Sequence, residues 1–266
     1  MNENQKEHIM PPAGWGNDAL SRFRAASIQN EYATFVAAPA WHKAMSDIAA
    51  DLHKCSNYAI SIALKTDDPS AQLLFTTACN QYLAAASLAT ACHCLGAYPT
   101  GRAALESALY GWYIARAPEA GKRWHNKPTK RDEARKWGTE FSFGRLATAL
   151  AEVSSDTAEW ARYLHQTAID FGAHPNKQAL YSNMSFEDRN DGTARIGMTV
   201  LHELGDLVLT TLKFVIETGL FAITLFAATF PEAEKKYLLW AAASAHKLTL
   251  SNLVDSSAAY FKRNEE

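Results

Sequence analysis

The stretch Asp170-Phe171-Gly172-Ala173-His174-Pro175-Asn176 places an imidazole near a carboxylate at a point where a helix must end. Pro175 disfavours the α conformation at the residue before it, so the helix is predicted to stop at His174. Asp170 could fix the tautomer of this ring, which would then serve as an acid, a base or a ligand. The amide of Asn176 can bond its own backbone and stiffen the turn. The ring can equally cap the last helical carbonyls, so both interpretations stay open.

A second candidate set lies on one predicted helix. Arg102 and Glu106 stand four residues apart and share a face, which Tyr110 and Tyr113 continue. A guanidinium and a carboxylate beside aromatic rings could bind or orient a ligand, with Tyr110 as one of its contacts. The spacing also fits a surface ion pair beside half-buried tyrosines.

A third set lies on the helix predicted from about residue 199 to 230. Rotation by 100° per residue gathers its polar side chains within an arc of about 80°. They are His202, Asp206, Thr210, Lys213, Glu217 and Thr224. His202 and Asp206 have the spacing of two metal ligands or of an imidazole oriented by a carboxylate. The stripe also fits the edge along which a mostly buried helix meets solvent.

The elements that must position these residues are helices. After a tail at residues 1–16, breaks at proline, glycine and turn residues predict helices at about 17–38, 40–65, 70–95, 102–117, 131–153, 155–173, 199–230 and 232–261. Around residues 176–198 the pattern differs, because the turn signal Asn190-Asp191-Gly192 between two short segments suits a small β-hairpin or a long loop. The sequence therefore predicts an all-α multi-helix bundle, one domain over residues 17–266, with one excursion.

Composition narrows the class of protein. Of 266 residues, 48% are apolar and 20% charged, as in soluble globular proteins. The net charge of −2 argues against broad capture of nucleic acid, although basic residues crowd positions 122–136, and nothing indicates DNA binding. The N-terminus lacks the apolar core of a secretion signal, and the uncharged stretch at 218–230 is too short to span a membrane. We therefore expect a cytoplasmic protein without a membrane partner.

Several chemistries lack their sequence signatures. There is no phosphate-cradling glycine loop, dinucleotide fingerprint or serine elbow, so no cofactor is predicted. The four cysteines fall within helical patterns, which favours buried, reduced thiols over a disulfide framework.

The quoted residues resemble a known group of proteins. A helix with Arg-x-x-x-Glu, here Arg102 to Glu106, and a later helix ending in His-Pro, here His174-Pro175, are similar to the HEPN-like superfamily of bacterial helical proteins. The resemblance covers roughly residues 100–180. It implies a helical homodimer that binds RNA or a nucleotide, or cleaves RNA in a toxin–antitoxin or phage-defence role. The family's ribonuclease motif, an arginine and then a histidine after four to six residues, is matched by Arg195 and His202, with Ile196 where active members usually have a polar residue.

The first hypothesis is accordingly a HEPN-like protein that binds RNA or a nucleotide and cleaves RNA at one polar site. Cleavage without a metal needs an imidazole base and a cation for the phosphate, roles that fall to His174 and Arg102. Arg195 and His202 are the substitute pair. Glu106, Asp170 and Asn176 complete the predicted site.

Two further hypotheses belong to other classes. The second hypothesis is a non-catalytic interaction protein that dimerises through apolar helix faces. Alternatively the chain is a metal-dependent enzyme within a helical bundle, in which His202 and Asp206 would supply ligands together with Glu203 and either His174 or Glu106.

Overall fold

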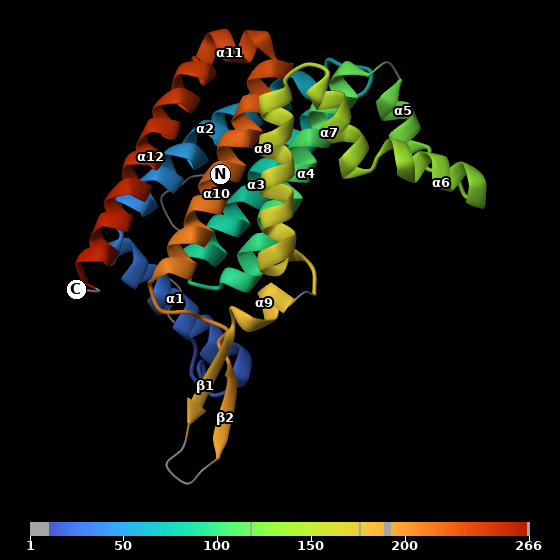
Figure 1. The fold of residues 1–266 in the computed structure, drawn as a ribbon. Helices are drawn as coiled ribbons and strands as arrows, with labels where there is room; N and C mark the ends of the chain where they lie inside the picture. The colour runs from blue at the N-terminus through green and yellow to red at the C-terminus, as the bar shows by residue number, and fades with distance from the viewer. Residues whose placement is uncertain (1–10, 118, 176, 189–192, 265–266) are drawn as a thin grey trace.

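The chain folds into a helical bundle with one small hairpin, so the predicted fold class is confirmed (Figure 1). The structure is a computed structural model that describes residues 11–117, 119–175, 177–188 and 193–264, with side chains as far as residue 257. The N-terminal half contains α1 (Ala19–Ala37), α2 (Pro39–Ala63), α3 (Ser70–Thr90), α4 (Cys94–Arg116), α5 (Ala120–His125) and α6 (Arg131–Glu140). Then follow α7 (Phe143–Ala151), α8 (Ser155–Ala168), the π-helical turn η1 (Ile169–Ala173), α9 (Lys177–Tyr181), β1 (Met184–Asp188), β2 (Ala194–Met198), α10 (Asp206–Thr229), α11 (Pro231–Tyr237) and α12 (Leu239–Asn264).

Helix α10 forms the centre of the bundle and contacts α2, α3, α4, α8 and α12. It is long and apolar enough to cross a membrane, but 72% of its most apolar window is buried against protein, as in the core helix of a soluble protein. The helices approach closely at Gly219, where an added Cβ would lie 2.5 Å from atoms of both Ile48 and Tyr82.

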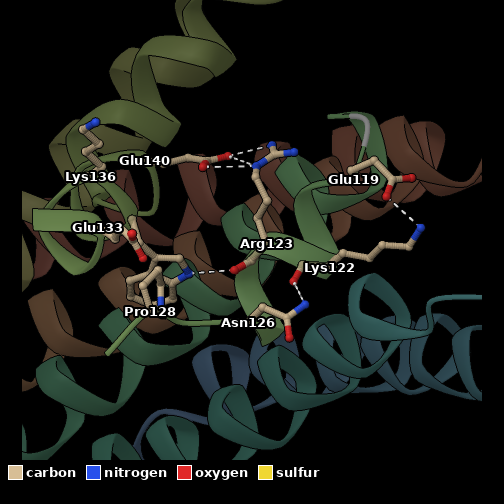
Figure 2. A pocket seen from close by; sticks show the side chains of 9 residues that line it. Glu119, Lys122, Arg123, Asn126, Pro128, Glu133, Lys136 and Glu140 are labelled. Carbon is tan, nitrogen blue, oxygen red and sulfur yellow. Dashed lines mark hydrogen bonds and ion pairs between the residues drawn. The ribbon is translucent and has the colours of Figure 1, made fainter. Parts of the chain in front are cut away.

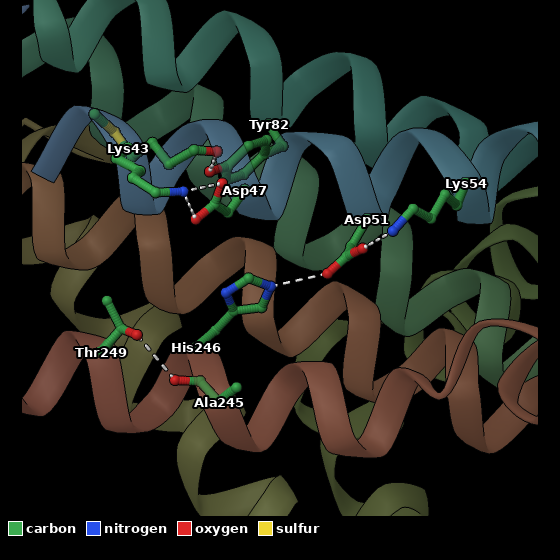
Figure 3. A network of polar contacts seen from close by, with 9 residues as sticks. Lys43, Asp47, Asp51, Lys54, Tyr82, Ala245, His246 and Thr249 are labelled. Carbon is green, nitrogen blue, oxygen red and sulfur yellow. Dashed lines mark hydrogen bonds and ion pairs between the residues drawn. The ribbon is translucent and has the colours of Figure 1, made fainter. Parts of the chain in front are cut away.

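The long C-terminal helix α12 is joined to α2 by a partly buried polar contact (Figure 3). His246 Nε2 lies 2.8 Å from the carboxylate of Asp51, which also accepts from Lys54 Nζ at 2.7 Å. Burial by itself would raise the pKa of Asp51, but the hydrogen bonds from Lys54 and His246 and their charges hold it below its ordinary value. The Lys43–Asp47 pair one turn earlier on α2 is exposed to solvent.

Several predicted helix boundaries are wrong. A break was expected between Gly96 and Gly101, yet α4 runs through Pro99. Proline removes one helical N–H and costs about 3 kcal/mol inside a helix, a cost that burial of Tyr98, Ala104 and their neighbours offsets. The predicted helix 131–153 is two helices, because Ser142 caps α7 by accepting from the N–H of Arg145.

The last two predicted helices also differ from the structure. α10 begins at Asp206, so residues 199–205 form a loop in place of its first two turns. The helix predicted at 232–261 is broken at Leu238, whose left-handed backbone (φ 53°) separates α11 from α12. Residues 1–10 of the predicted tail lie outside the described residues.

The excursion is an antiparallel hairpin that projects from one end of the bundle (Figure 1). Its register pairs Met184 with Met198, Phe186 with Ile196 and, at the next position, Glu187 with Arg195. Because successive side chains on a strand point to opposite faces, the hairpin has one apolar and one polar face. Phe186 and Ile196 are 65% and 62% exposed, so the apolar face is uncovered in the monomer.

Candidate functional site

The structure brings together an arginine, a carboxylate and an imidazole where α4 packs against α8. Arg102 Nε donates to Glu106 Oε1 at 2.7 Å, and His165 Nε2 lies 3.2 Å from the same oxygen. The predicted pairing of Arg102 with Glu106 is therefore observed, and α8 adds a histidine to it. We call these three side chains the Arg–Glu–His cluster.

The geometry of the cluster determines the tautomer and the orientation of the His165 ring. A carboxylate can only accept, so Nε2 of His165 carries the hydrogen and Nδ1 is the basic nitrogen of the neutral ring. The ring of Phe143 at the start of α7 stacks on the His165 ring, with centroids 3.6 Å apart and planes 9° apart. The side chain of His165 is 14% exposed and that of Glu106 31% exposed, so the cluster is shielded but reaches the surface.

Electrostatics keep the central carboxylate ionised. Burial by itself would raise the pKa of Glu106, but hydrogen bonds from His165 and Arg102, and their charges, hold it below its ordinary value. Only Nε of Arg102 donates to another group in the described part of the chain. The two terminal amino groups of Arg102 therefore keep their donors for a ligand.

The predicted aromatic continuation of this face is also observed. The hydroxyl of Tyr110 donates to the carbonyl of Phe141, and that of Tyr113 donates to Glu140 Oε1 at 3.3 Å. Burial raises the pKa of both tyrosines. The stripe on α4 thus anchors the segment that joins α6 to α7.

Beyond this junction, α5 and α6 form an arm that stands away from the bundle (Figure 1). They enclose a surface groove of about 430 Å³, shown in Figure 2. Arg123 at its centre pairs with Glu140 at 2.7 Å, while the indole of Trp137 donates to the Arg123 carbonyl at 2.9 Å. Lys127 lies over the Trp137 ring at 5.0 Å. The basic stretch predicted at 122–136 is therefore partly neutralised within the arm.

The structure places His174 elsewhere, in a hollow of about 620 Å³ that Leu95 at the start of α4 also lines. Leu95 and Glu106 are eleven residues apart on α4, or about 16 Å along the helix axis. In the described part of the chain no hydrogen bond joins His174 to Asp170, which instead accepts from Gln166 Nε2 at 2.8 Å. Asn176 lies outside the described residues.

The two residues of the substitute pair, Arg195 and His202, contact different parts of the structure. Arg195 lies on β2, with its guanidinium 4.0 Å from Glu187 across the hairpin. His202 lies in the loop before α10. Its backbone N–H donates to the Cys92 carbonyl, and its ring nitrogen Nε2 donates to Asn183 Oδ1 at 2.8 Å. Burial and the nearby His93 lower the pKa of His202.

Asp206 begins α10 and is exposed. His202 and Asp206 do not share a helical face, because the helix starts after His202. Among the described residues, no group of three or more His, Cys, Asp or Glu side chains is placed to hold a metal ion. The described cysteines are free thiols that are buried, and burial raises the pKa of Cys94 to about 11.

His165 and Phe143 were not predicted from the sequence. A signal existed, since His165 falls on the same helical face as Ala158, Ala161 and Ala168, all of which are buried. An imidazole within a stripe of small buried residues needs a polar partner, and the polar stripe of α4 supplies Glu106.

Comparison of the chain with protein-family models, with curated proteins and with solved structures finds no match.

Proposed function

We propose that this protein is a cytoplasmic RNA- or nucleotide-binding protein that holds a phosphate at Arg102 and cleaves RNA with His165 as the base. The observation that carries the proposal is the shared oxygen of Glu106, which fixes a guanidinium and an imidazole in one hydrogen-bonded unit. Cleavage of RNA without a metal requires one oriented base and one cation beside the phosphate.

The chemistry follows from the free atoms of the cluster. Nδ1 of His165 takes the proton of an RNA 2′-hydroxyl as that oxygen bonds to the adjacent phosphorus. The terminal amino groups of Arg102 stabilise the charge that develops on the phosphate oxygens. The bond from phosphorus to the 5′ oxygen then breaks, and this oxygen takes a proton from water. The products are a 2′,3′-cyclic phosphate and a 5′-hydroxyl end.

The arm formed by α5 and α6 supports the proposal as a contact for the nucleic-acid backbone. Residues 119–140 contain seven Lys and Arg against four Asp and Glu, although the whole chain has a net charge of −2. Basic side chains without a carboxylate partner in the described structure are Lys127, Arg131, Arg135 and Lys136. Tyr110, which binds the α6–α7 junction, stands one helical turn from Glu106, so a strand on the arm can reach the cluster.

Binding of a short, labelled single-stranded RNA, followed by fluorescence anisotropy, tests the proposal. Arg102→Gln removes one phosphate contact and is expected to weaken binding about tenfold, a change of about 1.4 kcal/mol. Arg145→Gln is the matched control, because Arg145 is an exposed arginine on α7 outside the cluster. Its affinity should stay within about twofold of wild type.

Cleavage of the same RNA separates binding from chemistry. His165→Gln is expected to lower the rate at least about 100-fold while leaving affinity nearly unchanged, because the loss falls on general base catalysis. Circular dichroism establishes that each variant is folded. Absence of RNA binding by the wild type, or equal losses in the Arg102 and Arg145 variants, would contradict the proposal.

A second candidate function, assembly into a homodimer, is favoured by the uncovered apolar face of the hairpin. An isolated two-stranded hairpin is marginally stable in water, and Phe186 and Ile196 gain burial if two copies join at this face. Sedimentation velocity of Phe186→Ser against Glu187→Gln tests this, since Glu187 lies on the polar face. Dimerisation should be lost only in the Phe186 variant, and a monomeric wild type rules it out.

A further inference from the structure

The hollow beside His174 is a built feature of the fold. Its volume of about 620 Å³ lies within the range of about 300–1,000 Å³ typical of small-ligand sites. Four segments enclose it, namely the start of α4, the turn η1, the short helix α9 and the end of β2. It is separate from the Arg–Glu–His cluster, none of whose side chains lines it.

The turn η1 explains why space is left at this point. Helix α8 widens into a π-helical turn before the chain leaves it at His174, and such turns are frequent at functional sites. A Cβ at Gly172 would lie 2.8 Å from the carbonyl oxygen of Leu95, so glycine allows the turn to rest directly on α4. Pro175 then directs the chain away, and the hollow remains between the turn and α9.

The inner surface of the hollow is apolar and open to water. Leu180 is 50% exposed and Met198 53% exposed, and Leu95, which also lines the hollow, is accessible to solvent. These are large side chains that ordinarily lie in a core. A hydrocarbon group that covered them would remove this apolar surface from water, which favours binding.

The ionisable side chains that line the hollow carry charge of one sign. Among the described residues that line the hollow, the ionisable ones are His174 and Lys177, and both are cations when protonated. The acidic residue that lines the adjoining hollow, Asp170, already accepts a hydrogen bond from Gln166. A ligand that fits has an apolar body and a single anionic end.

We infer that this hollow binds a small amphipathic carboxylate. The hydrocarbon body lies against Leu95, Leu180 and Met198, and the carboxylate lies at Lys177 and His174. This inference is independent of the proposed action on RNA, because it uses none of the residues of the cluster.

Methionine methyl resonances report on this hollow directly. In protein labelled with [¹³C-methyl]methionine, Met198 lines the hollow, whereas Met45 is buried in the core and serves as the internal reference. Titration with octanoate, well below the concentration at which it forms micelles, should shift the Met198 signal to saturation and leave Met45 unchanged. Octanol and acetate should bind at least about tenfold more weakly than octanoate, because octanol lacks the carboxylate and acetate lacks the hydrocarbon chain.

A matched pair of lysine variants tests the role of charge. Lys177→Gln should weaken octanoate binding several-fold and leave octanol unaffected. Lys236→Gln is the control, because Lys236 also lies over a tyrosine ring, 5.0 Å from Tyr237 against 5.9 Å for Lys177 and Tyr181, but far from the hollow in sequence. Its affinity for octanoate should match that of wild type.

Four results would overturn the inference. These are the absence of a saturable shift at Met198, an equal shift at Met45, equal affinity for octanol, and equal effects of the two lysine variants. A Met198 shift that follows protein concentration, together with a dimer in sedimentation velocity, would identify a second copy of the chain as the occupant instead. Octanoate binding by a protein that fails to bind RNA would uphold the inference and contradict only the proposed function.

Discussion

The coupling between Glu106 and His165 is the contact on which the cluster depends, and a double-mutant cycle measures it. The variants are Glu106→Gln, His165→Gln and the double variant. Each single change removes the ionic hydrogen bond between the two side chains while keeping a side chain of similar length or polarity. The cycle therefore reports the pairwise free energy and cancels the separate effects on packing, including loss of the Phe143 stack.

The expected magnitude follows from the geometry. A hydrogen bond to a charged group contributes about 1.5–3 kcal/mol to stability. The bond here is 3.2 Å long and the carboxylate is partly open to solvent, so we place the coupling below this range, at about 1 kcal/mol. Glu106→Gln also weakens the bond from Arg102, and the total loss of unfolding free energy should reach about 2 kcal/mol.

The pH dependence has a definite sign. The pKa of Glu106 is lowered in the folded protein, so its stabilisation is complete above its unfolded pKa of about 4.3. It is lost as the pH falls through the lower folded-state value. The stability difference between wild type and Glu106→Gln should therefore be constant from about pH 5 upward and shrink at more acidic pH.

Urea unfolding followed by circular dichroism measures both effects. The exposed pair Lys122 and Glu119 provides a control cycle, for which no measurable coupling is expected. A Glu106–His165 coupling as small as that of the control would refute the cluster. A difference in unfolding free energy between wild type and Glu106→Gln that persists unchanged at pH 3 would refute it as well.

Two further predictions concern the bundle that positions the site. Asp51→Asn should lower the unfolding free energy by about 2 kcal/mol at neutral pH, because the buried carboxylate binds His246, whereas exposed Asp47→Asn should change it by less than about 0.5 kcal/mol. Urea unfolding checks both values. The effect of Asp51→Asn should fade in acid, as the pH falls through the lowered pKa of Asp51 and the carboxylate is protonated. Gly219→Ala should destabilise the protein by about 2 kcal/mol, because the added Cβ would collide with side chains of neighbouring helices. Gly138→Ala should stabilise it by about 0.5–1 kcal/mol, because the added Cβ enters open space within a helix. Both are measured by thermal unfolding, and two neutral variants would contradict the close packing at Gly219.

The sequence predicted those features that local rules control. Proline and glycine breaks located most helices, and the Asn-Asp-Gly signal located the hairpin, although its tip lies outside the described residues. Spacing of four residues paired Arg102 with Glu106 correctly, since both partners share one helix.

Features that depend on tertiary packing were missed or misplaced. His165 joins Glu106 only because α8 packs on α4, a contact between residues 59 positions apart. Pro99 stays helical because its neighbours are buried, an effect that local propensity does not contain. His202 lies in a loop because its backbone N–H donates to the Cys92 carbonyl and not to a carbonyl of its own helix.

Binding of an RNA phosphate at the Arg–Glu–His cluster can be observed directly in the ring ¹⁵N signals of histidine. These are recorded for the free protein and with an RNA that carries no 2′-hydroxyl at the bound linkage. His165→Gln assigns the signal. The His165 nitrogens are expected to shift to saturation together with RNA binding, while those of exposed His53 on α2 are not. RNA that binds and leaves the His165 signal unchanged would contradict binding at the cluster.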